Sequence, residues 1–180
     1  MPNDEARLIQ RAQRGDPAAF TAIYDRHQPA VYRYIYYRVS DVATAEDLTS
    51  DVFVRLVEKI DRFTYRGRPL LAWLYTIARN LVTDHHRRIG QATMLPLDEQ
   101  LVAETGDLEQ AAERGLAQRR LAAAPPHLTE DQRQVIILKF IEGQSNAEVA
   151  RILGKPVGAV KSLQHRALAA LRRILERNGN

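Results

Sequence analysis

The chain contains no cysteine, an absence that excludes disulfide bonds, zinc sites with thiolate ligands and redox sensing by its own thiols. No apolar run approaches the roughly 18 residues of a membrane-spanning helix. The N-terminal segment MPNDEARLIQ lacks the basic and apolar regions of a secretory signal peptide. From these absences we expect a cytoplasmic protein without a membrane span.

Charge is distributed unevenly over the 180 residues, of which 45% are apolar and 27% charged, as in a globular protein of one ordinary domain or two small ones. The formal net charge of +4 is made up of −1 over residues 1–60, +4 over 61–90, −5 over 91–132 and +6 over 133–180. Two basic blocks separated by an acidic one indicate either two contacts with a polyanion or the ordinary charge bias of solvated helices.

Helical periodicity dominates the chain, and no segment shows convincing strand alternation. Asp16 and Pro17 predict a helix start, and Pro29 is expected to end or kink that helix. Gly67 and Pro69 separate two later helices. The first of these has an apolar stripe at four-residue intervals, which two further residues widen: Leu48, Val52, Leu56 and Ile60, with Phe53 and Val57.

The segment WLYTIARNLVTDHHRR, residues 73–88, has two different sides as a helix. The apolar side consists of residues spaced by threes and fours, namely Leu74, Ile77, Ala78, Leu81 and Val82. The opposite side is polar and consists of Thr76, Arg79, Asn80, Thr83 and Arg87. Trp73, the only tryptophan, is expected in the core because its side of the helix is largely apolar.

This segment also raises the possibility of a metal-dependent enzyme, because Asp84, His85 and His86 are metal-ligating residue types. Consecutive helical residues project about 100° apart, so these three side chains cannot face one ion. The sequence also has no Gly-rich phosphate loop and no nucleophile elbow. We therefore expect no enzymatic activity, no metal and no cofactor.

The C-terminal half predicts a second helical domain at residues 113–180, after an acidic, weakly periodic linker at 91–112. Capping boxes at Thr129–Gln132 and Ser145–Glu148 mark helix starts. A short capped helix, a turn at Gly154 and a longer basic helix form a helix-turn-helix pattern. An antiparallel hairpin that binds only protein would give the same pattern. In the helix-turn-helix interpretation the residues left for DNA are Lys161, Ser162, Gln164, His165 and Arg172.

Two long blocks resemble conserved regions of the bacterial sigma factors of the sigma-70 family. AEDLTSDVFVRLVEKIDRFTYRGRPLLAWLYTIARNLVTDHHRR resembles the second region, and LTEDQRQVIILKFIEGQSNAEVARILGKPVGAVKSLQHRALAALRR resembles the fourth. Their order and the short linker are those of the extracytoplasmic-function (ECF) class. The resemblance implies an all-α protein of two small helical domains, residues 1–90 and 113–180, with a flexible linker at 91–112 and a helix-turn-helix in the second domain.

In this family the WL..IARN helix lies against the non-template strand of the minus-ten promoter element, and the loop before it captures a flipped base. By position that loop is residues 63–69. Amides can bond base edges, while arginine and tyrosine can bind phosphates or stack on bases. The resemblance thus implies minus-ten contacts from Tyr65, Arg66, Arg68, Arg79, Asn80, Thr83, Arg87 and Arg88.

The resemblance also assigns contacts with RNA polymerase and the minus-thirty-five element. One helix matches the segment that docks on the clamp helices of the beta-prime subunit, through Asp47, Thr49, Ser50, Asp51 and Phe53. The second domain would bind the beta flap and the minus-thirty-five element, the latter through Lys161, Ser162, Gln164, His165 and Arg166. Many relatives have arginine where this chain has Leu163, which either changes the minus-thirty-five preference or packs inward.

The implied function is that of a sigma factor that binds core RNA polymerase, directs it to specific promoters and helps to melt the minus-ten element. An anti-sigma factor that masks these surfaces is the further partner expected in this family. The alternative is a self-contained dimeric helix-turn-helix transcription regulator. That alternative explains the second basic block but not the first.

Overall fold

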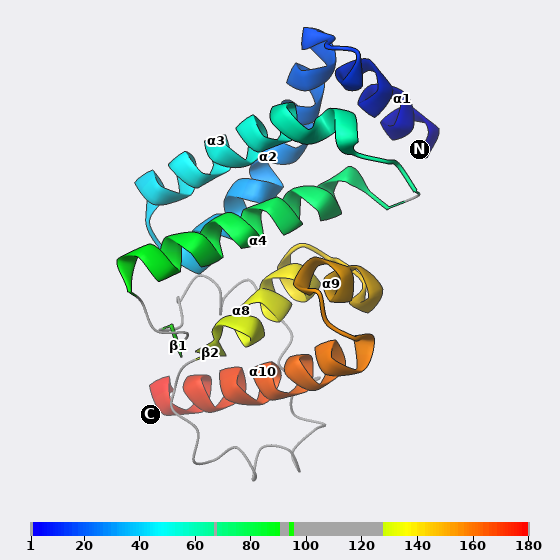
Figure 1. Ribbon diagram of the computed structural model, residues 1–180. Coiled ribbons are helices and arrows are strands. Elements are labelled where there is room, and N and C mark those ends of the chain that lie inside the picture. The colour runs from blue at the N-terminus through cyan, green and yellow to red at the C-terminus, as the bar shows by residue number, and fades with distance from the viewer. Residues whose placement is uncertain (1, 67, 91–93, 96–127, 180) are drawn as a thin grey trace. The chain divides into compact units, whose positions relative to one another are not determined.

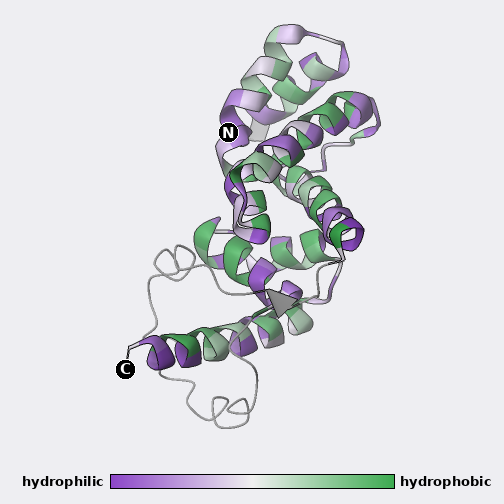
Figure 2. Ribbon diagram, turned by 90° about the vertical axis from the view of Figure 1, so that its left-hand side faces the viewer, coloured by the Kyte–Doolittle hydropathy of each residue, from purple (hydrophilic) through white to green (hydrophobic). Residues whose placement is uncertain are grey.

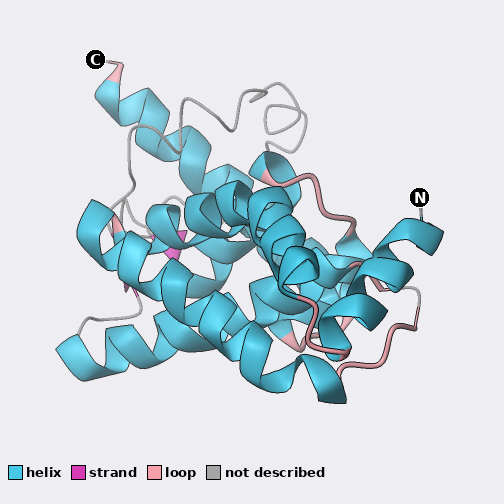
Figure 3. Cartoon of the chain, turned by 90° about the horizontal axis from the view of Figure 1, so that it is seen from above, coloured by secondary structure: helices cyan, strands magenta, loops and turns pink. Residues whose placement is uncertain are grey.

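The computed structural model describes residues 2–66, 68–90, 94–95 and 128–179, and the chain divides into two compact units, residues 1–88 and 89–180 (Figure 1). The first unit contains α1 (Pro2–Gln13), α2 (Pro17–Val39), α3 (Val42–Lys59), the 3-10 turn η1 (Ile60–Arg62) and α4 (Leu70–Ile89). The second contains β1 (Met94–Leu95), β2 (Leu128–Thr129), α8 (Glu130–Ile136), the π-helical turn η2 (Ile137–Ile141), α9 (Asn146–Leu153) and α10 (Val157–Asn178). The predicted all-α class is confirmed, and helices dominate the view in Figure 3.

Helix α2 begins where the sequence predicts it. The Asp16 carboxylate caps the helix by accepting a hydrogen bond of 3.0 Å from the Ala18 N–H, and Pro17 is the first helical residue. Arg11 of α1 donates from Nε to the same carboxylate at 2.8 Å. This hydrogen bond is the largest cause of the lowered pKa of Asp16. The cap therefore also ties the end of α1 to the start of α2.

Pro29 lies inside α2, so of the two predicted alternatives the helix end is wrong and the kink stays a prediction. The helix continues to Val39 and ends at Ser40, which has a φ of 54° and donates its N–H to Tyr36 O at 2.8 Å. An internal proline costs about 3 kcal/mol because one backbone donor is lost. Each large apolar side chain that is fully buried contributes about 1.5–3 kcal/mol, and α2 buries such residues on both sides of Pro29: Ile23, Val31 and Ile35. Tertiary packing thus outweighs the local signal.

The core of the first unit lies between the apolar faces of its helices, which alternate with polar faces in Figure 2. Tyr34 of α2 contacts Tyr75 of α4 with ring centroids 5.3 Å apart, and its hydroxyl accepts a 3.0 Å hydrogen bond from the buried Arg38. The apolar stripe predicted for α3 is buried except at Val57. This residue is 52% exposed, so the prediction is wrong for it. The stripe is buried at Leu48, Val52, Leu56, Ile60 and Phe53.

A short antiparallel ribbon precedes the described helices of the second unit, and the sequence did not predict it. Met94 pairs with Thr129, and Leu95 pairs with Leu128. Strand β1 falls within the predicted linker, whose other residues, 91–93 and 96–112, lie outside the described part of the chain. Residues 113–127 of the predicted second domain lie outside it as well.

The helix-turn-helix is formed by α9 and α10, and the two helices α8 and α9 begin at the predicted caps. At α8 the Thr129–Gln132 capping box has both of its hydrogen bonds, each 3.1 Å long. At α9 the Ser145 hydroxyl accepts a hydrogen bond of 3.2 Å from the Glu148 N–H. Gly154 then ends α9 with a φ of 65°, a conformation that glycine adopts without strain from a side chain. No described helix is both long and apolar enough to span a membrane.

Candidate nucleic-acid interfaces

Helix α4 has the two sides that the sequence predicts. All five residues of the predicted apolar side are buried: Leu74, Ile77, Ala78, Leu81 and Val82. On the opposite side Asn80 and Arg87 are exposed, while Thr76, Arg79 and Thr83 are half-buried. The structure therefore brings four of the predicted minus-ten residues, Arg79, Asn80, Thr83 and Arg87, onto one accessible helix face. Arg88 is exposed at the end of the same helix.

The loop before α4 is held to that helix at both ends. At its start the Phe63 ring stacks on Trp73, with centroids 4.7 Å apart and an interplanar angle of 29°. At its end Arg68 Nη2 donates to Ala72 O at 3.3 Å and to Thr76 Oγ1 at 3.2 Å. Trp73 is half-buried and packs against one side of the loop. It is therefore not the central core residue that the sequence predicted.

The other predicted contacts of this loop differ in exposure. Arg66 is exposed, whereas Tyr65 and Arg68 are half-buried. The Arg68 guanidinium is occupied by the start of α4 in this structure, so its main role here is to hold the loop end. Arg66 is thus the loop arginine most accessible to a phosphate. Gly67 lies outside the described residues.

The end of α4 carries three adjacent residues of metal-ligating types, and they do not converge. The His85 and His86 rings are 6.0 Å apart between centroids and tilted by 50°. Asp84 lies 3.9 Å from Arg87 Nη1 in an exposed ion pair, an arrangement that contributes little to stability. Within the described residues no group of three or more histidine and carboxylate side chains is arranged to hold a metal ion. The positive charge at this end of the helix comes from Arg87 and Arg88, which are exposed.

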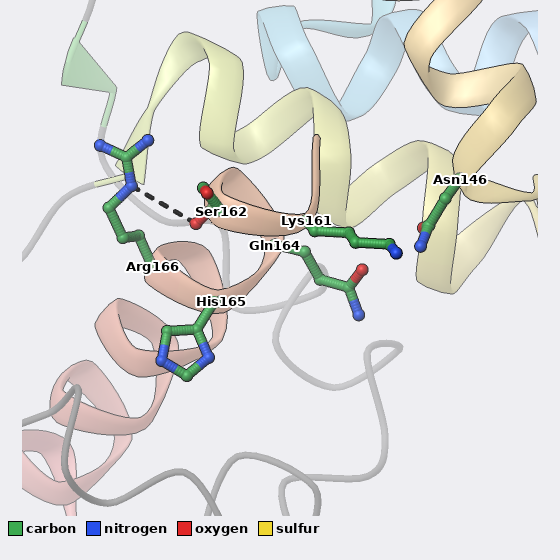
Figure 4. Close-up of a pocket in the computed structure, with 6 residues that line it drawn as sticks. All are labelled: Asn146, Lys161, Ser162, Gln164, His165 and Arg166. Atoms are coloured by element: carbon green, nitrogen blue, oxygen red, sulfur yellow. Dashed lines mark hydrogen bonds between the residues drawn. The ribbon is translucent and has the colours of Figure 1, made fainter. Parts of the chain in front are cut away.

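The N-terminal half of α10 borders a pocket of about 840 Å³ (Figure 4). The pocket is lined by all five residues predicted to read the minus-thirty-five element, namely Lys161, Ser162, Gln164, His165 and Arg166, together with Asn146 of α9. Arg166 donates from Nε to the Ser162 carbonyl at 3.4 Å, the dashed line in Figure 4. Arg172, which the helix pattern also left for DNA, does not line the pocket and instead bonds Glu176 at 3.1 Å.

Leu163 and Asn146 take different places around this pocket. Leu163 is only 8% exposed, so the structure selects the inward-packing alternative for this residue. Asn146 projects from the start of α9 towards Lys161 and Gln164 in Figure 4. Its Oδ1 is inaccessible to solvent and accepts no hydrogen bond from the described residues. The sequence reasoning missed Asn146, although its position directly after the Ser145 cap of a helix-turn-helix was a usable signal.

Comparison with known proteins decides the family. Residues 23–91 match Sigma-70 region 2, and residues 118–171 match Sigma-70, region 4. The chain is 44% identical to the ECF RNA polymerase sigma factor BldN of Streptomyces coelicolor, over 96% of this chain and 67% of that relative. The chain belongs to the ECF sigma factors of the sigma-70 family. Members of this family are transcription initiation factors.

Solved structures agree with the assignment of this chain to the sigma factors. The chain is similar to CnrH in a complex with the cytosolic domain of CnrY, with a TM-score of 0.70 and 28% identity over 96% of this chain and 97% of that one. It is also similar to the sigma factor RpoE of Bartonella quintana in a complex with the anti-sigma factor NepR. There the TM-score is 0.63 and the identity 28%, over 87% of this chain and 96% of that one.

The structure corrects part of the predicted polymerase surface of this sigma factor. Asp47, Ser50 and Asp51 are exposed on α3. Thr49 and Phe53, by contrast, are only 3% and 7% exposed. Thr49 donates its hydroxyl proton to Ala45 O at 2.6 Å, and Phe53 packs edge-on against Tyr24 at 4.8 Å. These two residues support the helix from the core side, so a partner on the outer face of α3 cannot contact them.

An apolar part of the same outer face was not predicted. Val54 is 54% exposed and follows Ser50 by four residues and Asp51 by three, so it lies on their side of α3. Val57 lies one turn further on and is 52% exposed. The sequence did not predict the exposure of Val54 and Val57, because the spacing of apolar residues along a helix does not show how wide its buried face is.

Proposed function

We propose that this sigma factor binds core RNA polymerase, directs it to a specific set of promoters and helps to melt their minus-ten element. The observation that carries the proposal is that each unit turns one polar, cation-bearing helix face to solvent. These faces lie on α4 and on the N-terminal half of α10, within the segments that match sigma regions 2 and 4. We assign the first unit to the minus-ten element and the second to the minus-thirty-five element, with residues 1–90 and 113–180 as their domains.

For minus-ten recognition, the exposed face of α4 supplies Asn80 for a base edge and Arg87 for a phosphate. An amide offers both a donor and an acceptor, which suits a base edge, and an exposed arginine suits the backbone. The loop before α4 receives the extruded base beside Tyr65, with Arg66 on the phosphates. Removing a base from the stack costs a few kcal/mol, and contacts made only with the extruded base offset that cost and keep the duplex open.

For minus-thirty-five recognition, the pocket residues of α10 enter the major groove. Lys161 and Arg166 provide charge for phosphates or guanine edges, and Gln164 suits adenine. Asn146 of α9 lines the same pocket and adds a carboxamide group to the surface that would face the bases. The buried position of Leu163 means that it tunes preference only through packing.

For polymerase binding, we assign the outer face of α3 to the clamp helices of the beta-prime subunit, through Asp47, Ser50 and Asp51. Val54 provides an apolar anchor within that polar surface, an arrangement typical of protein interfaces. The second unit docks on the beta flap. Because CnrH and RpoE are solved with CnrY and the anti-sigma factor NepR, we also propose an anti-sigma partner for this chain. Its work on promoters places it in the cytoplasm.

The test is reconstitution with bacterial core RNA polymerase and run-off transcription from a pool of promoter fragments. We expect a one-to-one complex that initiates only when the sigma factor is present. Asn80→Ala should lower discrimination among minus-ten variants about tenfold, as the loss of one good base contact would. Gln10→Ala, an exposed amide on α1, is the control and should discriminate like the wild type. A protein that ignores core polymerase but shifts duplex DNA as a dimer would instead be a self-contained regulator.

A further inference from the structure

Gln13, the last residue of α1, makes two long-range hydrogen bonds with one side-chain amide. Its Nε2 donates to Ile60 O at 2.9 Å and to Phe63 O at 2.7 Å, residues 47 and 50 positions away. A carboxamide nitrogen has two N–H donors, so both are used. The side chain is half-buried, which shields these bonds from competition by water. One glutamine thus joins α1 to both ends of the turn that leads into the loop before α4.

Phe63 is the point at which this loop begins, and it is fixed from two sides. Its N–H donates to Ile60 O at 3.0 Å, and its carbonyl accepts from Gln13. Its ring stacks on Trp73 at the start of α4. The Gln13 amide therefore fixes the backbone of the residue whose ring sets the spacing between loop and helix. A change at Phe63 O is transmitted directly to Thr64 and Tyr65, which follow in the loop.

We propose that Gln13 is a positioning residue for minus-ten recognition, holding the start of the loop at residues 63–69 in the geometry that captures an extruded base. The inference rests on the proposed function of that loop. By this proposal α1 contributes to promoter specificity, and it does so separately from the DNA-facing side of α4 and the outer face of α3. Gln13 acts through Phe63 and makes no contact with DNA itself.

The attachment of α1 does not depend on Gln13. Leu8, Ile9 and Ala12 of α1 are 8%, 2% and 1% exposed, and Arg11 bonds the Asp16 cap. Burial of these apolar side chains is the larger contribution, whereas each hydrogen bond contributes only about 1 kcal/mol net. Removal of the Gln13 donors should therefore loosen the loop while α1 stays packed. This difference makes a positioning role separable from a structural one.

Three substitutions test the hydrogen bonds themselves. Gln13→Met keeps the length and removes both donors, and Gln13→Glu places a carboxylate against two carbonyl oxygens. Gln13→Lys restores donors on a side chain long enough to reach both carbonyls. The matched control is Gln10→Met, the same change at an exposed glutamine of the same helix.

The measurement is equilibrium binding of the holoenzyme to single-stranded oligonucleotides with the non-template minus-ten sequence of a promoter selected in the reconstitution. Each base is replaced in turn, and the ratio of the wild-type and substituted affinities gives the discrimination at each position. We expect Gln13→Met and Gln13→Glu to lower discrimination at the captured base about fivefold or more, with affinity for core polymerase unchanged. Gln13→Lys and Gln10→Met should keep the wild-type ratio.

Two results overturn the inference, and they are distinguishable. If Gln13→Met keeps the wild-type discrimination while its melting temperature falls, Gln13 only stabilises the fold and the proposed function of the loop stands. If the wild-type holoenzyme shows no discrimination at any position of the oligonucleotide, the proposed function of the loop fails and the role of Gln13 fails with it.

Discussion

His27 should make the first unit markedly less stable in mild acid. The side chain is 8% exposed on α2, and its Nε2 lies 4.0 Å from Glu5 Oε1 of α1, too far for a hydrogen bond. Burial, followed by the positive charge of Arg26, lowers the pKa of His27 from 6.5 to about 4. The folded chain therefore keeps a neutral imidazole at pH values at which the unfolded chain has bound a proton.

The sign and size of the effect follow from these two pKa values. Because the unfolded state binds more protons between them, the contribution is fully present above pH 6.5 and is lost as pH falls towards 4. The expected loss is about 1.4 kcal/mol near pH 5.5 and about 2.6 kcal/mol near pH 4.5. A loss of this size is a large fraction of the roughly 5–15 kcal/mol that stabilises a typical domain.

The assay is urea unfolding at these pH values and near pH 7, monitored by the fluorescence of Trp73, which lies in the same unit. His27→Gln removes the titrating group. Asp16 and Asp41 also have lowered pKa values and weaken the fold in acid, so the informative quantity is the wild-type loss minus the variant loss. Equal losses would refute a buried neutral His27. A wild type that gains stability relative to His27→Gln as pH falls would show that Glu5 pairs with a protonated imidazole.

Three further predictions concern the two candidate interfaces and α3. Leu163→Ala should destabilise the second unit by about 2–5 kcal/mol, measured by circular dichroism, whereas Leu163→Met should stay within about 1.5 kcal/mol and keep the wild-type promoter preference. Asn146→Ala should weaken binding to a minus-thirty-five duplex about fivefold without changing the salt dependence, because a neutral amide releases no counterions. Asp51→Ala should weaken binding to core polymerase in a pull-down titration, whereas Thr49→Val should not, because Thr49 faces the core.

The parts of the fold that the sequence predicted correctly depend on residues within about four positions of each other. The buried side of α4 follows from three- and four-residue spacing, and the caps at Asp16 and Thr129 follow from side chains that bond the next turn. The pocket residues of α10 also follow from a short pattern, because one helix carries them all. All the residues on which such a prediction depends lie within one short segment of the sequence.

The wrong predictions arose where distant packing decides. Pro29 locally favours a helix end, the alternative that proved wrong, but the core on both sides of it keeps α2 continuous. Thr49 and Phe53 match a family segment by position, but position along a helix does not state which way each side chain turns once neighbouring helices pack against it. The pairing of β1 with β2 and the hydrogen bonds of Gln13 join residues tens of positions apart. No local sequence pattern predicts such contacts.

The division into two compact units has a consequence for the promoter binding proposed above. Two surfaces on one chain bind as linked modules, so engagement of one raises the effective concentration of the other near its target. Neither contact then needs to be strong, and each can be lost separately while the other remains. For an initiation factor, such avidity combines selective capture with stepwise release, because breaking one weak contact at a time requires less energy than breaking one strong contact.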